Sequence, residues 1–150
     1  MNNKKIKIAV ITSFFNPEIT QKLKWGALMR LEECGISHDQ LTIVDVPGAV
    51  EIPLIAQQCA KKNIYHAIIC LGAVIRGETS HYDYVCDQVS RGCQQVMLQY
   101  DIPIIFGVLT TDNDEQALDR VGGLHGHKGR DAADAALEMI ALMDSLRSQG

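Results

Sequence analysis

Two continuous apolar segments constrain the fold of this chain more than any other feature of its sequence. Residues 64–74 read IYHAIICLGAV and residues 102–110 read IPIIFGVLT, and neither segment contains Asp, Glu, Lys or Arg. A strand with one solvated face alternates apolar and polar residues, whereas a continuous apolar run fits a parallel strand covered on both faces. The two segments therefore predict buried strands of a parallel sheet.

Two more strands and five helices are predicted along the rest of the chain. Residues 6–13 and 41–46 are short apolar segments that favour strands. Helical spacing of apolar residues, with Pro17 in a first turn and Gly35 at a stop, indicates the first helix. Thr79, Ser80 and Asn113 are candidate N-caps of later helices. The predicted helices cover residues 17–34, 51–62, 80–99, 114–121 and 129–148, and residues 122–129 (GGLHGHKG) are predicted to form a glycine-rich loop.

This alternation of strands and helices predicts one α/β domain over residues 1–150. Right-handed crossovers place helices on both faces of a parallel sheet, so the expected fold is a three-layer α/β/α sandwich with a doubly wound, four-stranded parallel sheet, flavodoxin-like in architecture. Ligands of such folds bind beyond the carboxyl ends of the strands. The segments that follow the four strands contain the unusual residues of the chain: SFFN, VPGAVE, GAVIRGETSH and FGVLTTDN.

Charge and cysteine content exclude several classes of function. The 14 Lys and Arg residues are scattered and are outnumbered by 18 Asp and Glu, which argues against a nucleic-acid partner. The sequence lacks the features of a signal peptide and has no apolar stretch long enough to span a bilayer, so we expect no membrane association. The five cysteines form no CxxC pair, which predicts reduced thiols in the cytoplasm.

The segment before the third long helix favours an anion site. Neither GxGxxG nor GxxxxGK[ST] occurs in the chain, so the common nucleotide motifs are absent. Gly72, Gly77, Thr79 and Ser80 nevertheless place small residues ahead of a helix start, where free backbone amides bind phosphate. Plain helix capping explains the same residues, and Arg76 is either an added positive charge or a solvated strand end.

His81 lies in the first turn of that helix. The positive end of the helix macrodipole disfavours an imidazolium ion, and a neutral imidazole accepts protons near neutral pH, as general acid–base catalysis requires. Asp83 and Asp87 are close enough in sequence to orient the ring. From these residues alone, proton transfer by His81 and a purely structural place in the first turn of the helix are equally supported. His125 and His127 lack a third ligand, so no metal site is predicted.

Four further residues are candidates for ligand contacts. Phe15, beside Phe14 and next to an amide side chain, suits stacking on a planar heterocycle, although one of the two rings is equally suited to the core. Glu51 either binds hydroxyl groups or favours a helix start. Arg120 and Lys128 flank the glycine-rich loop and either grip anionic or carbonyl oxygens or lie on the surface.

Five segments in order resemble the lumazine synthase family over residues 12–143. These segments are SFFNPEIT, VPGAVEIP, GAVIRGETSHYDYVC, IIFGVLTTDNDEQALDRVGG and HKGRDAADAALEMI. The resemblance implies a transferase of riboflavin biosynthesis without metal or organic cofactor. It implies condensation of 5-amino-6-(D-ribitylamino)uracil with 3,4-dihydroxy-2-butanone 4-phosphate to 6,7-dimethyl-8-ribityllumazine, phosphate and water, through an imine, phosphate elimination and ring closure. The alternatives are a flavin-binding module without catalysis and a related riboflavin synthase.

The resemblance also implies a role for each matching residue. His81 corresponds to the proton-transfer histidine, and Phe15 to the ring that stacks on the pyrimidine. Substrate contacts are implied for Ala49, Val50 and Glu51 at the ribityl chain, for Ala73, Val74 and Ile75 through their backbone, for Phe106, and for Lys128 near the pyrimidine carbonyls. Phosphate contacts are implied for Glu78, Thr79 and Arg120.

The resemblance finally implies a homo-oligomer. The family's active site lies between neighbouring subunits of a pentamer, and Phe106, Arg120 and Lys128 come from across the interface. The short loop GGLHGHKG resembles members that assemble twelve pentamers into an icosahedral capsid, for which riboflavin synthase is an expected partner. Glu78 and Phe14 depart from the common pattern, in which a small residue and a basic residue are frequent. The backbone amide of Glu78 is still able to face the phosphate, and the sequence leaves the direction of its carboxylate open.

Overall fold

The four predicted strands form one parallel sheet in the computed structural model, which describes residues 2–149. The strand order is β2-β1-β3-β4, and each neighbouring pair is parallel. Ile11 in the centre of β1 lies opposite Val44 of β2 and Cys70 of β3. The strands are β1 (Ile8–Ser13), β2 (Leu41–Val46), β3 (Ala67–Ile75) and β4 (Ile104–Thr111). Each begins within three residues of its predicted start.

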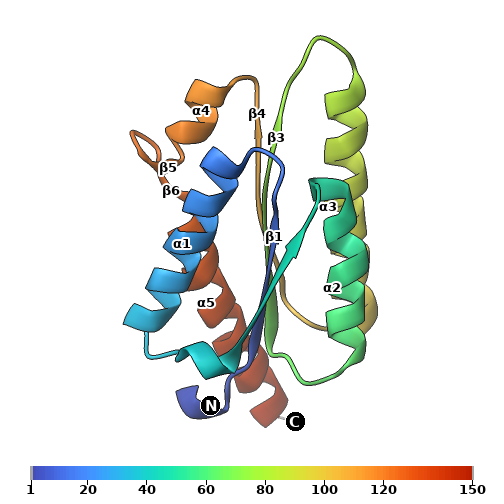
Figure 1. Cartoon of the computed structure of the whole chain (residues 1–150). Coiled ribbons are helices and arrows are strands. Elements are labelled where there is room, and N and C mark those ends of the chain that lie inside the picture. Colours follow the sequence, from blue (N-terminus) through green and yellow to red (C-terminus); the bar gives the residue numbers. More distant parts are fainter. Residues whose placement is uncertain (1, 150) are drawn as a thin grey trace.

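Helices cover both faces of this sheet. Figure 1 shows α1 and α5 on one face and α2 and α3 on the other, which confirms the predicted three-layer, flavodoxin-like arrangement. The α-helices are α1 (Pro17–Glu33), α2 (Ile52–Lys61), α3 (His81–Tyr100), α4 (Asp114–Leu118) and α5 (Lys128–Ser148), and short 3-10 turns form η1 (Asn3–Lys5), η2 (His38–Gln40) and η3 (Ala49–Glu51).

Burial on both faces explains the continuous apolar segment of β3, whereas the other continuous segment forms the edge strand β4. In β4, Phe106 and Thr110 are exposed, so the prediction of full burial was only partly right there. All six residues of β1 and the first eight of β3 are buried. Val10 and Ile69 pack into the core beneath α1 and α5, whereas Ile11 and Cys70 pack into the core beneath α2 and α3. Because successive side chains of a strand point to opposite faces, a strand buried on both faces favours apolar residues along its length, and β1 departs from this only at its last two residues, Thr12 and Ser13.

The segment predicted as a glycine-rich loop contains a small antiparallel hairpin, so that prediction was wrong. Strand β5 (Val121–Gly123) pairs with β6 (Gly126–His127). Gly122 and Gly126 have φ angles of 108° and 79°, in the left-handed region that glycine adopts without strain. The glycines that suggested a loop therefore provide the backbone conformations of the hairpin.

At both helix starts, one of the predicted cap residues accepts a backbone hydrogen bond through its side chain. The Asn113 side chain accepts a hydrogen bond from the Gln116 amide at 2.8 Å, as predicted for the start of α4. Ser80 is the residue before α3, but its side chain makes no capping hydrogen bond. The Thr79 hydroxyl instead accepts a bond from the His81 amide at 3.3 Å.

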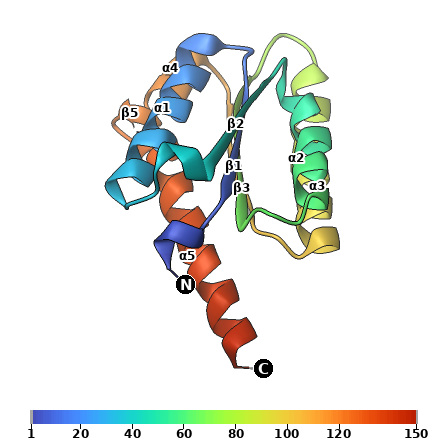
Figure 2. The same ribbon diagram turned by 60° about the horizontal axis from the view of Figure 1, so that its bottom comes forward.

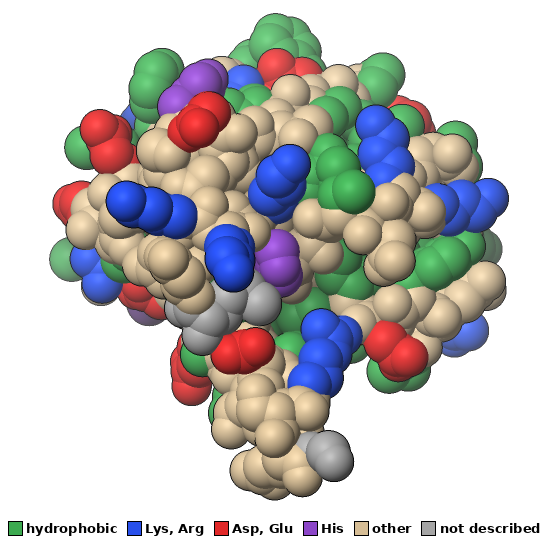
Figure 3. Space-filling model, turned by 90° about the horizontal axis from the view of Figure 1, so that it is seen from below, with side chains coloured by type: hydrophobic (Ala, Val, Ile, Leu, Met, Phe, Trp, Pro, Cys, Tyr) green, Lys and Arg blue, Asp and Glu red, His purple; other side chains and the backbone are tan. Residues whose placement is uncertain are grey.

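Helix α5 extends from the body of the molecule, and the face seen from below carries charges of both signs. Figure 2 shows the C-terminal end of α5 extending past the sheet. On the face seen from below in Figure 3, Lys and Arg side chains are interspersed with acidic, apolar and uncharged ones. No helix within residues 2–149 has the length and apolar character needed to cross a membrane.

The packing of α1 on the sheet yields a prediction about stability. The Leu31 side chain of α1 is fully buried in the core between this helix and the sheet, whereas its neighbour Glu32 is exposed. Leu31→Ala removes buried surface and leaves a cavity, so we expect the free energy of unfolding to fall by about 2–5 kcal/mol. Glu32→Ala, the matched control, changes it by less than about 0.5 kcal/mol. Denaturant titration followed by circular dichroism measures both, and similar values for the two variants contradict the core assignment.

Candidate functional site

A pocket of about 270 Å³ lies at the carboxyl ends of the strands, where the sequence predicted a site. The ends of β1 and β3, the turn before η3 and the start of α3 contribute to its wall. The pocket brings together seven residues predicted from the sequence: Phe15, Ala49, Ala73, Val74, Ile75, Thr79 and His81. Five further residues line it: Asn16, Gly48, Gly77, Tyr82 and Val85.

The segment after β1 holds Phe15 at the rim of the pocket. The Phe14 amide donates to the Val46 carbonyl at 2.7 Å, and the Phe15 amide donates to the Pro47 carbonyl at 3.0 Å. These bonds tie the segment to the end of β2. Phe15 is 70% exposed and Phe14 58% exposed, so neither ring belongs to the core. An aromatic ring that is both exposed and backbone-anchored suits stacking on a planar ligand.

His81 begins α3 and lines the pocket with an exposed side chain. The two carboxylates proposed to orient it are engaged elsewhere. Asp83 lies 3.8 Å from the Arg76 guanidinium, and Asp87 lies 2.7 Å from that of Arg91. The imidazole therefore depends on the pocket and its contents, rather than on these two groups, for its orientation.

Arg76 fixes the turn between β3 and α3. Its Nε donates to Asp112 at 3.0 Å, and its guanidinium carbon lies 4.4 Å from the centre of the Tyr82 ring. Its backbone amide donates to the Thr111 carbonyl at 2.8 Å. The hydrogen bond with Asp112 raises the pKa of Arg76. These contacts join the ends of β3 and β4 to the first turn of α3, which is the turn that places His81.

Tyr82 and Val85 line the pocket although the sequence reasoning did not select them. Val85 is four residues after His81 and therefore lies on the same face of α3. Burial, followed by a hydrogen bond with Cys86, raises the pKa of the Tyr82 phenol. Helical spacing from His81 was the signal that could have found Val85, whereas Tyr82 reaches the pocket through its contact with Arg76.

Six residues selected from the sequence do not line this pocket: Arg120 and Lys128, which line a second pocket, and Val50, Glu51, Glu78 and Phe106. The Glu51 carboxylate accepts a hydrogen bond from the Gly48 amide at 3.0 Å and so stabilises the turn before α2. Val50 is 38% exposed, and Glu78 is exposed in the turn before α3. Phe106 lies on the edge strand β4 with 36% of its side chain exposed.

Arg120 and Lys128 line a second pocket of about 350 Å³, separate from the one that contains His81. The Lys128 amide donates to the Arg120 carbonyl at 2.7 Å, and the Arg120 guanidinium donates to the Gln116 carbonyl at 2.8 Å. His125 and Asp131 lie beside them, together with the last residues of β4. We call this second pocket the cationic half-site. Within one chain it does not complete the pocket of His81.

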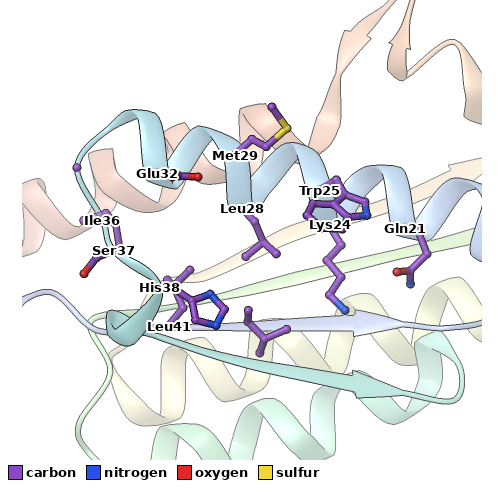
Figure 4. A pocket seen from close by; sticks show the side chains of 12 residues that line it. Gln21, Lys24, Trp25, Leu28, Met29, Glu32, Ile36, Ser37, His38 and Leu41 are labelled. Atoms are coloured by element: carbon purple, nitrogen blue, oxygen red, sulfur yellow. The ribbon is translucent and has the colours of Figure 1, made fainter.

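A wider hollow of about 660 Å³ lies between α1 and the edge strand β2 (Figure 4). Trp25, Leu28, Met29 and His38 line it. Lys24, which also lines it, is paired with Asp45 at 3.0 Å. None of the residues selected from the sequence lies in this hollow. Among residues 2–149, no three His, Cys, Asp or Glu side chains are grouped to hold a metal ion.

Comparison with known proteins gives one consistent result. The sequence model of the 6,7-dimethyl-8-ribityllumazine synthase family matches residues 5–144 of the chain. Two proteins named 6,7-dimethyl-8-ribityllumazine synthase, from two strains of Coxiella burnetii, are 57% identical to it over 146 residues. The matches cover 97% of this chain and 97% of each relative.

The contacts of Arg76 predict a local change in dynamics. Arg76→Ala removes the bonds to Asp112 and Asp83, so we expect backbone amides of residues 77–81 to exchange with solvent faster. Amides of β1 should keep their rates. Arg91→Ala removes an exposed ion pair within α3 and is the matched control. Hydrogen exchange followed by mass spectrometry measures these rates, and equal effects of the two variants contradict the assigned role of Arg76.

Proposed function

The chain belongs to the 6,7-dimethyl-8-ribityllumazine synthase family, and from this premise we propose the reaction that it catalyses. It condenses 5-amino-6-(D-ribitylamino)uracil with 3,4-dihydroxy-2-butanone 4-phosphate to give 6,7-dimethyl-8-ribityllumazine, phosphate and water, the penultimate step of riboflavin biosynthesis. One observation carries the proposal. The match over residues 5–144 includes every element that lines the His81 pocket and the cationic half-site.

The pyrimidine binds against Phe15, whose exposed ring stands at the rim of the pocket. The backbone of Ala73, Val74 and Ile75 forms the opposing wall, because these residues end the central strand β3. Stacking holds the flat heterocycle, and backbone amides and carbonyls distinguish its polar edges. The ribityl chain extends towards the turn of Ala49, Val50 and Glu51.

The phosphate of the second substrate binds at the start of α3. Backbone amides of Glu78 and Thr79 lie in the exposed turn that precedes the helix, where the macrodipole favours an anion. Arg120 adds a guanidinium, which matches phosphate through paired hydrogen bonds. Glu78 presents its amide to the phosphate and its carboxylate to solvent, since two negative charges repel each other.

His81 moves protons between the intermediates. The substrate amine attacks the ketone, and a proton passes from nitrogen to the developing alkoxide before water leaves and the imine forms. Removal of a proton next to the imine then expels phosphate, and ring closure releases a second water. Each step needs a group that takes up and returns a proton, which an exposed imidazole in the pocket provides. Lys128 lies near the pyrimidine carbonyls and stabilises negative charge there. The mechanism uses no metal or organic cofactor.

The complete site forms between two subunits of a homopentamer in the cytoplasm. Two features support this part of the proposal. Arg120 and Lys128 line a pocket separate from that of His81, so a second copy has to bring them to it. Phe106 is exposed on an edge strand, where a neighbour can use it. We further propose that twelve pentamers assemble into an icosahedral capsid, with riboflavin synthase as a partner. This step rests only on the shortness of the hairpin formed by β5 and β6.

The assay of the proposed reaction combines the two substrates and follows the fluorescence of the lumazine product. We expect product with the unmodified protein and a kcat reduced about 10²–10⁴-fold in His81→Ala, with KM values changing less, because general acid–base catalysis contributes about that factor. His38→Ala, in the hollow between α1 and β2, is the control and should keep its kcat. An unchanged kcat in His81→Ala would contradict the catalytic role of His81. Formation of riboflavin instead of lumazine would identify a different synthase.

The shared site predicts complementation between two inactive variants. Arg120→Ala and His81→Ala each disable one half of every site. When the two chains are unfolded together and reassembled, about a quarter of the sites in a randomly mixed ring contain both intact halves. We therefore expect activity to return in the mixture but not when each variant is reassembled alone. A mixture without activity, although size-exclusion chromatography shows co-assembly, means that His81 and Arg120 act within one chain.

A further inference from the structure

His127 occupies the joint between three elements on which the cationic half-site depends. It is the last residue of β6, it immediately precedes α5, and its ring contacts α1. Lys128 is the next residue along the chain. Within the hairpin, His127 pairs with Val121, the residue that follows Arg120. Arg120 and Lys128 are therefore adjacent in sequence to the paired residues Val121 and His127.

The His127 side chain is the N-cap of α5. Its Nδ1 accepts hydrogen bonds from the Gly129 amide at 3.1 Å and from the Arg130 amide at 3.3 Å. An imidazole nitrogen accepts only when it carries no proton, so the neutral ring must have its proton on Nε2. The first turn of a helix leaves its amides without partners, and this single nitrogen satisfies two of them.

The ring is also packed tightly against α1. A Cβ atom on Gly26 would lie 2.6 Å from the ring Nε2 and closer still to Cε1, so only glycine leaves space for the imidazole. Gly129 is equally constrained, because a Cβ there would overlap the Leu23 carbonyl of α1. The start of α5 and the middle of α1 therefore meet through two glycines, with the His127 ring between them.

The backbone of the half-site is fixed by the same joint. The Lys128 amide donates to the Arg120 carbonyl at 2.7 Å, and the His125 amide donates to the Asp119 carbonyl at 2.9 Å. Both bonds join the hairpin to the residues after α4. If the cap at His127 is lost, the first turn of α5 loosens, and with it the bond that holds Lys128 beside Arg120.

We propose that His127 is a positioning residue, which holds Arg120 and Lys128 together through the N-cap of α5 and releases them when its ring is protonated. The roles of Arg120 and Lys128 rest on the function proposed above, whereas the clamp itself rests on the contacts of His127. Protonation places a donor at Nδ1, opposite two amide donors and at the positive end of the helix macrodipole.

The surroundings favour the neutral ring. Burial, followed by the positive charge of Arg130, lowers the pKa of His127, while Asp131 and a backbone hydrogen bond at Lys22 act in the opposite direction. Further charged or titratable residues adjoin these contacts: Lys22 on α1, Arg120 before the hairpin, His125 in its turn and Lys128 on α5. A histidine whose pKa falls on folding stabilises the fold while it is neutral. This contribution is present above the ordinary pKa of 6.5 and is lost as the pH falls below it.

The decisive comparison is between His127→Ala and His127→Asn. Asn accepts amide hydrogen bonds at an N-cap as His127 does, but it does not titrate, whereas Ala removes the acceptor. Near pH 7.5 we expect His127→Ala to raise KM for the butanone phosphate about fivefold, the equivalent of a typical N-cap, with a smaller change in kcat. His127→Asn should keep KM within about twofold of the unmodified protein. A wild-type KM in His127→Ala overturns the proposal.

The pH dependence of KM tests whether protonation of His127 releases Arg120 and Lys128. The phosphate of the substrate itself titrates near pH 6, so the informative quantity is the ratio of the KM of the unmodified protein to that of His127→Asn at each pH. We expect this ratio to rise as the pH is lowered from about 7.5 to about 5.5, because only the unmodified protein loses its cap. A constant ratio means that protonation of His127 does not release the half-site. This comparison does not need His127→Ala to fold.

Hydrogen exchange separates a failure of this inference from a failure of the proposed function. Amides of residues 119–130 should exchange faster in His127→Ala than in the unmodified protein, and at the original rate in His127→Asn. His66→Ala is the matched control, because the Nδ1 of His66 accepts the Lys7 amide at 3.0 Å near the amino end of β1, away from the half-site. Unchanged exchange in His127→Ala overturns the clamp. The expected pattern in a protein that makes no lumazine supports the clamp and rejects only the proposed function.

Discussion

The burial of β1 and β3 on both faces is the constraint on which the rest of this structure depends. Two strands without a solvated face require helices on either side, and the chain provides them as α1 with α5 and α2 with α3. Helical crossovers between neighbouring strands make all four strands parallel, so their carboxyl ends meet along one edge. The pocket of His81 exists because the segments that follow β1, β2 and β3 are brought together at that edge.

The division of the proposed site follows from the same architecture. Loops that follow β1, β2 and β3 surround the His81 pocket, whereas the segment after β4 carries Arg120 towards α5 and away from it. Each half is held by hydrogen bonds within the chain, from side chains as well as from the backbone. Arg76 secures the turn that places His81, and His127 secures the joint that places Lys128 beside Arg120. In the function that we propose, one site takes each of these halves from a different copy of the chain.

Sequence patterns predicted the layers well, because those patterns arise from burial. The continuous run in β3 and the amide cap of Asn113 both follow from local rules, and both are present. The hairpin leaves no clear pattern in the sequence because its strands are too short to show an apolar alternation, and its glycines are equally typical of an irregular loop. Seven of the selected site residues meet in one pocket, whereas Glu51 bonds the turn of Gly48 and Arg120 lies elsewhere.

The sequence by itself determined the α/β class, the edge at which the candidate site lies and, through five ordered segments, the family. These properties depend on the residue types within each element, and a single chain displays them directly. Only the tertiary structure decided that Arg76 is paired with Asp112 and that the His127 ring packs against Gly26. The physical reason is distance along the chain. Gly26 and His127 are a hundred residues apart, and no local pattern records which side chains the packing of α1 on α5 brings into contact.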